Sequence, residues 1–289
     1  MKLINQICSL LLAGLACGCA SNNTANEESK INISATTGLI SEATFDLKRI
    51  TNAERKELGI DTILKGDNHY NYPNRDIAKG KEIYKGEEGR IASFLVIWVE
   101  QAIFEYLVSY DPSGNVIDHI MIGVDYYYSS DLLSASIEGN KIRSISEWAD
   151  PGEAWGEGID QIYTITDDLH FIPFAWTAQS FPVEIPFLTY KTEEPAFYYN
   201  IESVTCIGKS GNNYTFVIKG KSQQDFKPLK AAARTLMFEP YDKEGISVGE
   251  AIKVVIPAVR ENETFEIKVK GLTKSKVDEN SFTRFHIQR

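Results

Sequence analysis

Residues 91–123 read IASFLVIWVEQAIFEYLVSYDPSGNVIDHIMIG, and this stretch decides the fold class. Its run at 93–99 is apolar and rich in β-branched and aromatic residues, which is typical of a strand covered on both faces. A second run at 104–110 leads into the turn residues Asp-Pro-Ser-Gly-Asn and then into a third run at 116–123. Two runs separated by such a turn predict a β-hairpin, so we expect antiparallel strands here.

The same pattern recurs later in the sequence. Two further strand pairs are expected at 134–145 and 159–174, and successive hairpins predict an antiparallel β-meander. Before the meander, Thr51 and Glu54 have the spacing of a capping box, which predicts one short helix. We therefore expect a mostly β N-terminal domain at 41–175.

The next segment, residues 176–195, is rich in proline and aromatic residues. Pro182, Pro186 and Pro195 cannot donate a backbone hydrogen bond to a sheet, so we expect a linker or an edge, not a central strand. Aromatic side chains such as Trp176 argue against a freely mobile linker. We expect them to pack the two flanking domains together.

Residues 196–289 contain a second β pattern, with apolar runs at 201–207, 214–219, 234–238, 253–256, 264–269 and 282–287. The sequence TFEIKV at 264–269 alternates apolar and charged residues, as in a half-exposed strand. This many short strands in so few residues predict a β-sandwich. The expected fold class is therefore mainly β, with a meander followed by a sandwich.

A resemblance supports this second domain. The sequence FEPYD at 238–242, followed by Lys-Glu-Gly, resembles the F-x-L-Y-D motif of FxLYD domains, although Pro240 stands where the motif has leucine. FxLYD domains are immunoglobulin-like β-sandwiches that are common in bacterial lipoproteins. The resemblance covers only the C-terminal third of the chain. It implies an immunoglobulin-like fold, and it implies no catalytic residues.

The N-terminus carries the pattern of an export signal. Lys2 precedes an apolar run at 7–16 that is too short to span a bilayer, and small residues then precede a cysteine. The stretch resembles the lipobox of bacterial lipoproteins, in which a diacylglycerol is attached to that cysteine. Cys19 fits the pattern better because alanine and glycine stand at the preferred positions before it. Cys17 is the alternative.

This interpretation divides the start of the chain into a signal peptide with its lipobox at 1–19 and a flexible tether at 20–40. The polar sequence ASNNTANEESK in the tether cannot bury a core. The resemblance implies a palmitate-bearing lipid anchor. No aspartate follows either cysteine, which favours the outer membrane, with the protein facing the periplasm or the cell surface.

Composition limits the other functions. The chain has 289 residues, 43% of them hydrophobic, which is enough for a sizeable core. Its formal net charge of −10 opposes binding to nucleic acid and to anionic headgroups, so membrane contact is expected through the lipid anchor alone. Cys206 is the one cysteine expected in the folded part, as a small buried hydrophobe, so no disulfide framework is predicted.

The sequence shows no pattern that binds a cofactor or a metal. The four histidines are far apart and lack metal-ligand spacing. A glycine-rich phosphate loop, a dinucleotide fingerprint and a serine nucleophile motif are also missing from the sequence. We therefore expect no cofactor.

One stretch, EWADPGEAWGEGID at 147–160, is unusual. Indole rings can stack on sugars while carboxylates accept hydrogen bonds from hydroxyl groups, so a glycan-binding loop is one interpretation, with Trp148, Trp155, Glu153, Glu157 and Asp160 as candidate ligand-binding residues. A simpler interpretation is an acidic surface loop whose tryptophans anchor it to the meander. A third is a glycosidase that uses two of the carboxylates.

Together these patterns predict an exported, lipid-anchored envelope lipoprotein. Its expected role is that of a binding or structural module without catalysis, with a glycan or an envelope protein as partner. The alternative is a glycan-active hydrolase that uses the carboxylates at 147–160.

Overall fold

The computed structural model of the chain describes residues 30–37, 49–65, 75–98, 102–126, 132–149, 154–178, 180–192, 199–222, 233–259, 262–273 and 277–288. The expected signal peptide at 1–19, with Cys17 and Cys19, lies outside the described residues. Within the described ranges, no helix has both the length and the apolar character needed to cross a membrane.

The described chain is mainly β, which confirms the expected fold class. Its N-terminal part contains two helices, α1 (Asn52–Glu57) and α2 (Ile60–Leu64), and nine strands: β1 (Ile33–Thr37), β2 (Arg75–Gly86), β3 (Gly89–Trp98), β4 (Ala102–Tyr110), β5 (Val116–Tyr126), β6 (Leu132–Gly139), β7 (Lys141–Ala149), β8 (Ala154–Ile165) and β9 (Phe171–Pro173). A 3-10 helix (Trp176–Ala178) follows, and then β10 (Val183–Glu184), β11 (Phe187–Thr192), β12 (Tyr199–Ser210), β13 (Asn213–Ser222), β14 (Arg234–Tyr241), β15 (Ile252–Ile256), β16 (Thr264–Thr273) and β17 (Arg284–Gln288).

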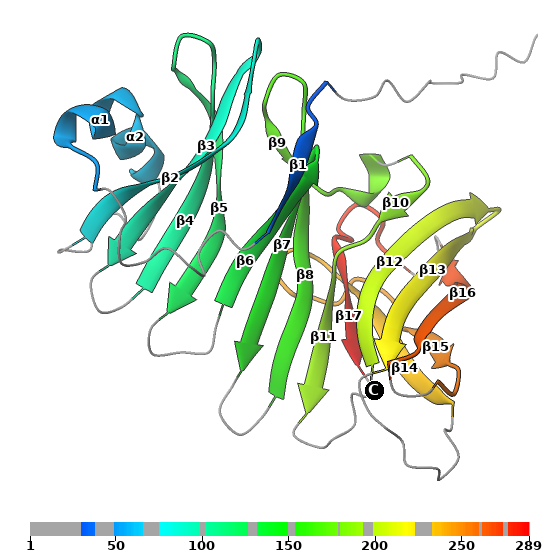
Figure 1. Ribbon diagram of the computed structural model, residues 1–289. Coiled ribbons are helices and arrows are strands. Elements are labelled where there is room, and N and C mark those ends of the chain that lie inside the picture. The colour runs from blue at the N-terminus through cyan, green and yellow to red at the C-terminus, as the bar shows by residue number, and fades with distance from the viewer. Residues whose placement is uncertain are drawn as a thin grey trace, which may run out of the picture.

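A 13-stranded sheet extends through most of the molecule (Figure 1). Its order is β15-β14-β17-β11-β8-β7-β6-β5-β4-β3-β2, with β1 paired to β6 and β9 paired to β8. The three predicted hairpins, β4–β5, β6–β7 and β8–β9, are antiparallel neighbours in this sheet. A second sheet, β10-β12-β13-β16, packs against the end of the large sheet that lies away from the helices (Figure 1). This pair of sheets forms a β-sandwich.

An apolar core fills the sandwich. Phe216 on β13, Phe238 on β14 and Phe285 on β17 are each at most 2% exposed and belong to one cluster. Cys206 on β12 belongs to the same core as a free, fully buried thiol, as the sequence predicted, and burial raises the pKa of that thiol. The sandwich is therefore held by apolar packing between its two sheets.

The two helices cover one face of the meander. Ile60 and Ile63 on α2 pack in a cluster with Phe94 on β3 and Phe104 on β4. A strand exposes alternate side chains on opposite faces, and every residue of β4 is buried, so β4 is covered on both faces. The helices supply the cover on the face that Phe104 occupies.

The start of α1 confirms the predicted capping box. The backbone N–H of Glu54 donates to the Thr51 hydroxyl at 3.2 Å, and the Thr51 N–H donates to the Glu54 carboxylate at 2.8 Å. These two bonds satisfy donors that the first helical turn leaves without a partner.

The prediction of a flexible tether at 20–40 is wrong for residues 33–37, because these residues form β1. Ile31 and Ile33 are 1% and 5% exposed, since they pack in a cluster on the face of the meander opposite the helices. The backbone N–H of Lys30 also donates to Asp167 at 3.0 Å. These two buried isoleucines attach residues 31–37 to the meander through apolar packing, which the polar sequence at 20–30 cannot provide.

The prediction of a linker or an edge at 176–195 is also wrong, because this segment contains β10 and β11. β11 lies between β8 and β17 in the large sheet, antiparallel to the first and parallel to the second, so it is a central strand. Pro182 and Pro186 fall immediately before the two strands, where their missing N–H groups do not interrupt the ladder. The sandwich expected at 196–289 therefore includes two strands that come before its expected first residue.

Candidate functional site

The tryptophan-rich stretch forms a β-hairpin and not the expected loop. Trp148 lies on β7 opposite Gly156, and Trp155 lies on β8 opposite Ala149. Aromatic residues favour strands, and this preference outweighs the glycines and acids between them. The side chains of both tryptophans, and Glu153 as a whole, lie outside what the structure describes.

Glycine is required at one position of this hairpin. Gly158 has φ +152°, and a Cβ atom there would lie 2.3 Å from the backbone oxygen of Phe187 on β11. The Thr189 hydroxyl on β11 also donates to the backbone oxygen of Glu157 at 2.8 Å. Glu157 thus contributes to the contact between β8 and β11 through its backbone.

Asp160 is set apart from its neighbours by a β-bulge. Ser144 on β7 pairs with Gln161 and Ile145 pairs with Ile159, so Asp160 is an extra residue in β8. The bulge lets Ile159 and Ile162 both enter the sandwich core, although they are three positions apart. The Asp160 carboxylate instead forms an ion pair with Arg284.

Arg284 connects Asp160 to a histidine. Its Nη1 lies 2.9 Å from the Asp160 carboxylate, and its Nε–H donates to Nε2 of His286 at 3.3 Å. Because Phe285 and Ile287 are in the sandwich core, alternation places Arg284 and His286 on the opposite face of β17. The arginine reaches over β11 to β8, so the ion pair links strands that are not neighbours.

Two tyrosine rings cover the imidazole of His286. The Tyr241 ring on β14 stacks on it with centroids 3.7 Å apart and planes 14° apart, and the Tyr190 ring on β11 lies 4.8 Å away. His286 is 5% exposed, and this burial, together with the Arg284 charge, lowers its pKa to about 4. The imidazole is therefore neutral at pH 7 and accepts a hydrogen bond at Nε2.

A carboxylate completes the group at its β14 side. The Tyr241 hydroxyl donates to the Glu239 carboxylate at 3.3 Å, and the Ser247 hydroxyl donates to the same carboxylate at 2.7 Å. Burial is the main cause that raises the pKa values of both Tyr190 and Tyr241. The tyrosines therefore keep their protons at neutral pH. We call Asp160, Tyr190, Glu239, Tyr241, Arg284 and His286 the β8–β14 cluster.

The β8–β14 cluster suits recognition better than catalysis. Its histidine is neutral and covered, and its arginine is engaged by Asp160, so the cluster contains no activated nucleophile. Half-buried aromatic rings beside fixed charges can stack on a ligand and orient its polar groups. Among the residues that the structure describes, no group of three or more His, Cys, Asp or Glu side chains could hold a metal ion.

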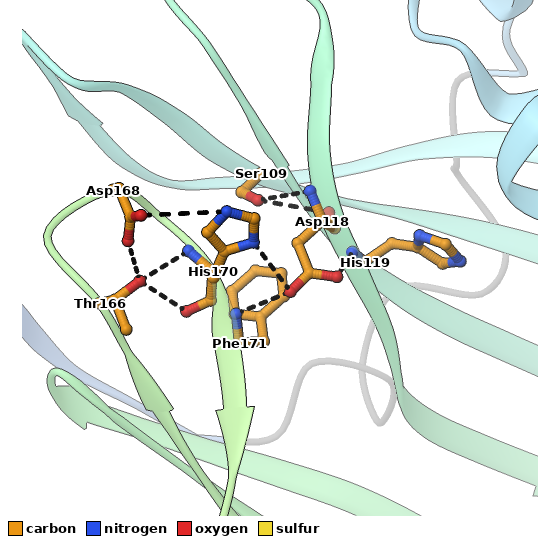
Figure 2. A network of polar contacts seen from close by, with 7 residues as sticks. All are labelled: Ser109, Asp118, His119, Thr166, Asp168, His170 and Phe171. Carbon is orange, nitrogen blue, oxygen red and sulfur yellow. Dashed lines mark hydrogen bonds and ion pairs between the residues drawn. The ribbon is translucent and has the colours of Figure 1, made fainter.

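A second polar network lies near the turn between β8 and β9 (Figure 2). Asp118 on β5 accepts a hydrogen bond from the backbone N–H of Phe171 at 2.8 Å, and its carboxylate lies 3.7 Å from His170. Ser109 exchanges hydrogen bonds with the Asp118 backbone instead of with His170. The Ser, His and Asp side chains here do not form a catalytic triad; they join β9 to β5.

Sequence reasoning identified Asp160 but missed the residues around it. Its partners on β11, β14 and β17 are distant in the sequence, and nothing in the spacing of Arg284 and His286 links them to Asp160. The alternation of polar and apolar residues in RFHIQ at 284–288 was the available signal, because it marks a strand with one polar face.

No protein-family model, no curated protein and no solved structure matches this chain.

Proposed function

We propose that the chain is an exported, lipid-anchored lipoprotein of the bacterial envelope, with a palmitate-bearing Cys19, and that its folded part is a binding or structural module without catalysis. The observation that carries this proposal is the lipobox-like sequence at 1–19. The first residue that the structure describes, Lys30, comes eleven residues after Cys19 in the sequence, and β1 follows it in the sheet. A short connection of this kind suits a module held near an outer-membrane surface.

Labelled palmitate tests the anchor. Cys19→Ser is expected to lose the label and membrane association, while Cys17→Ser keeps both. The reverse result would assign the anchor to Cys17. Retention of the label by each single variant and by the double variant would contradict lipidation at this site.

We also propose that the sandwich is immunoglobulin-like and related to FxLYD domains. In immunoglobulin sandwiches the second strand pairs with the fifth and the third with the sixth. Counting from β12, the pairs β13–β16 and β14–β17 follow this order. Phe238 of the motif is 1% exposed in the core, and Asp242 begins a turn by accepting the N–H of Ile246 at 2.7 Å.

We propose that binding involves two elements, the hairpin of β7 and β8 and the β8–β14 cluster, which lies on the face of the sheet opposite to that of Glu157. Trp148, Trp155, Glu153, Glu157 and Asp160 remain the proposed ligand-binding residues, and the partner is a glycan or an envelope protein. Support comes from Asp160, which the bulge and Arg284 hold in the cluster, where its charge acts on Tyr190. The hairpin extends directly from this cluster along β8.

A glycan panel tests the binding proposal. Trp155→Ala is expected to lose binding with an unchanged melting temperature, and the buried Trp176, changed to Phe, serves as the control that alters the core. Hydrolysis of a glycan by the parent protein would support the alternative, a glycan-active hydrolase. Loss of stability in Trp155→Ala, with no binding by the parent, would contradict a ligand-binding role for Trp155.

A further inference from the structure

Glu105 is a buried carboxyl group in the centre of the meander. It lies on β4, opposite Leu95 on β3 and Gly123 on β5, and it is 2% exposed. Its neighbours on the same face of β4, Ile103 and Leu107, both belong to apolar clusters. An ionised carboxylate is costly in such surroundings unless several donors satisfy it.

The donors around Glu105 are few. The Ser93 hydroxyl on β3 bonds to the carboxyl group, and Oε2 of Glu105 has no hydrogen-bond partner among the described residues. The Ser93 hydroxyl itself accepts the backbone N–H of Lys81 at 3.0 Å. A chain of hydrogen bonds therefore runs from Glu105 across β3 to the backbone of β2.

The sheet is irregular on both sides of Glu105. The register between β2 and β3 shifts between Lys79 and Glu82, and the register between β4 and β5 shifts between Glu105 and Tyr106. At the first shift, a Cβ on Gly80 would lie 2.1 Å from the Ser93 hydroxyl oxygen, so only glycine fits. β2 is also the end strand of the sheet. The ladder is therefore interrupted where the Ser93 connection reaches the end strand β2.

We propose that Glu105 acts as a proton-dependent latch on β2. While Glu105 is a neutral acid, the bulge at Gly80 and Lys81 stays closed, with the Lys81 N–H bonded to the Ser93 hydroxyl. When Glu105 is a carboxylate, this bond breaks and the bulge opens away from β3. Opening admits water to the charged group and lets the exposed Lys81 ammonium approach it. The described groups that face Glu105 from β3 and β5, Ser93, Leu95 and Gly123, do not titrate. Lys81 supplies the charge that acts on Glu105 from β2.

The pH range of the latch follows from the burial of Glu105. Burial raises its pKa from the usual 4.5 to about 7, against the opposing effects of Ser93 and Lys81. Once opening exposes the carboxyl group to water, its pKa returns toward 4.5. The opening equilibrium is then expected to increase about tenfold per pH unit between about pH 5 and pH 7 and to level off above pH 7.

Hydrogen exchange of the full chain, corrected for the intrinsic pH dependence of amide exchange, tests the latch. Protection of the β2–β3 amides is expected to fall about fortyfold from pH 5 to pH 7 in the parent and to stay level in Glu105→Gln. Amides of β12 and β13, in the other sheet, are the internal control and should not change. Ser93→Ala removes the hydroxyl that holds the Lys81 N–H, so protection of the β2–β3 amides should already be low at pH 5 and show little further fall.

Two results would overturn the proposal. One is level protection of β2–β3 across this range in the parent; the other is an equal fall in Glu105→Gln. If Glu105→Gln does not fold, a pH-dependent fall in Ser93→Ala as large as that of the parent overturns the latch, and low, level protection of β2–β3 in Ser93→Ala supports it.

Discussion

The sandwich depends on the residues just before it, and this dependence predicts the behaviour of two fragments. A fragment of residues 196–289 keeps β12 to β17 but lacks β10 and β11. Besides Ile159 and Ile162, it loses five buried side chains of this core, each at most 6% exposed: Phe174, Trp176, Val183, Ile185 and Phe187. A fragment of residues 172–289 keeps all five.

The magnitude follows from burial. Each such side chain contributes about 1.5–3 kcal/mol when it is buried, so the five together contribute about 8–15 kcal/mol. This is as large as the whole stability of a typical domain, about 5–15 kcal/mol. We therefore expect the 196–289 fragment to show no cooperative unfolding. The 172–289 fragment loses only Ile159 and Ile162 from the core, roughly 3–6 kcal/mol, and should unfold cooperatively.

Circular dichroism during urea titration, with the dispersion of amide NMR signals, measures both fragments. Tryptophan fluorescence is unsuitable, because the shorter fragment contains no tryptophan. In the longer fragment, Phe187→Ala is the matched test of the mechanism and should cost about 3–5 kcal/mol. Cooperative unfolding of the 196–289 fragment, with a stability within about 2 kcal/mol of the longer one, would refute this reasoning.

Three further predictions concern Glu105, the Arg143–Glu184 pair and Gly158. Because the pKa of Glu105 is raised in the folded state, the free energy of unfolding should fall by about 3 kcal/mol between pH 4.5 and pH 7, and urea titrations of Glu105→Gln should lack this fall. Two nitrogens of the Arg143 side chain donate to the Glu184 carboxylate at 2.8–3.1 Å. A double-mutant cycle of Arg143 and Glu184 should therefore give a coupling free energy of about 1–2 kcal/mol. A coupling below about 0.3 kcal/mol would contradict a role of this pair in joining β7 to β10. Gly158→Ala should lower stability by roughly 1–3 kcal/mol more than Gly208→Ala. Gly208 is the matched control because it has a similar φ, but a Cβ added there has no atom within 4 Å. Equal melting temperatures of the two variants would argue against the close approach of Gly158 to β11.

The sequence predicted the local parts of this fold. Hairpins such as β4–β5 and β6–β7 were predictable because their turn residues and apolar runs are adjacent in the chain. The capping box of α1 was predictable for the same reason, since Thr51 and Glu54 lie within one turn.

The long-range pairings were not predictable from local patterns. β11 pairs with β17 almost a hundred residues later, and its short run between prolines looks like an edge or a linker until that partner is known. For the β8–β14 cluster, the acidic composition pointed to Asp160. The bulge that turns Asp160 toward Arg284 depends on the register of β7 against β8, which no local pattern specifies.

The position of β17 has a consequence for how the protein matures. The last described strand of the chain, Arg284–Gln288, lies between β14 and β11, so the large sheet is divided into two pieces until those residues arrive. A chain that leaves a ribosome or crosses a membrane N-terminus first can complete the meander early. The edges of β11 and β14 then stay open until Arg284–Gln288 emerge. Assembly of the sandwich therefore waits for β17, and until β17 pairs, the two open edges can pair with strands of other chains.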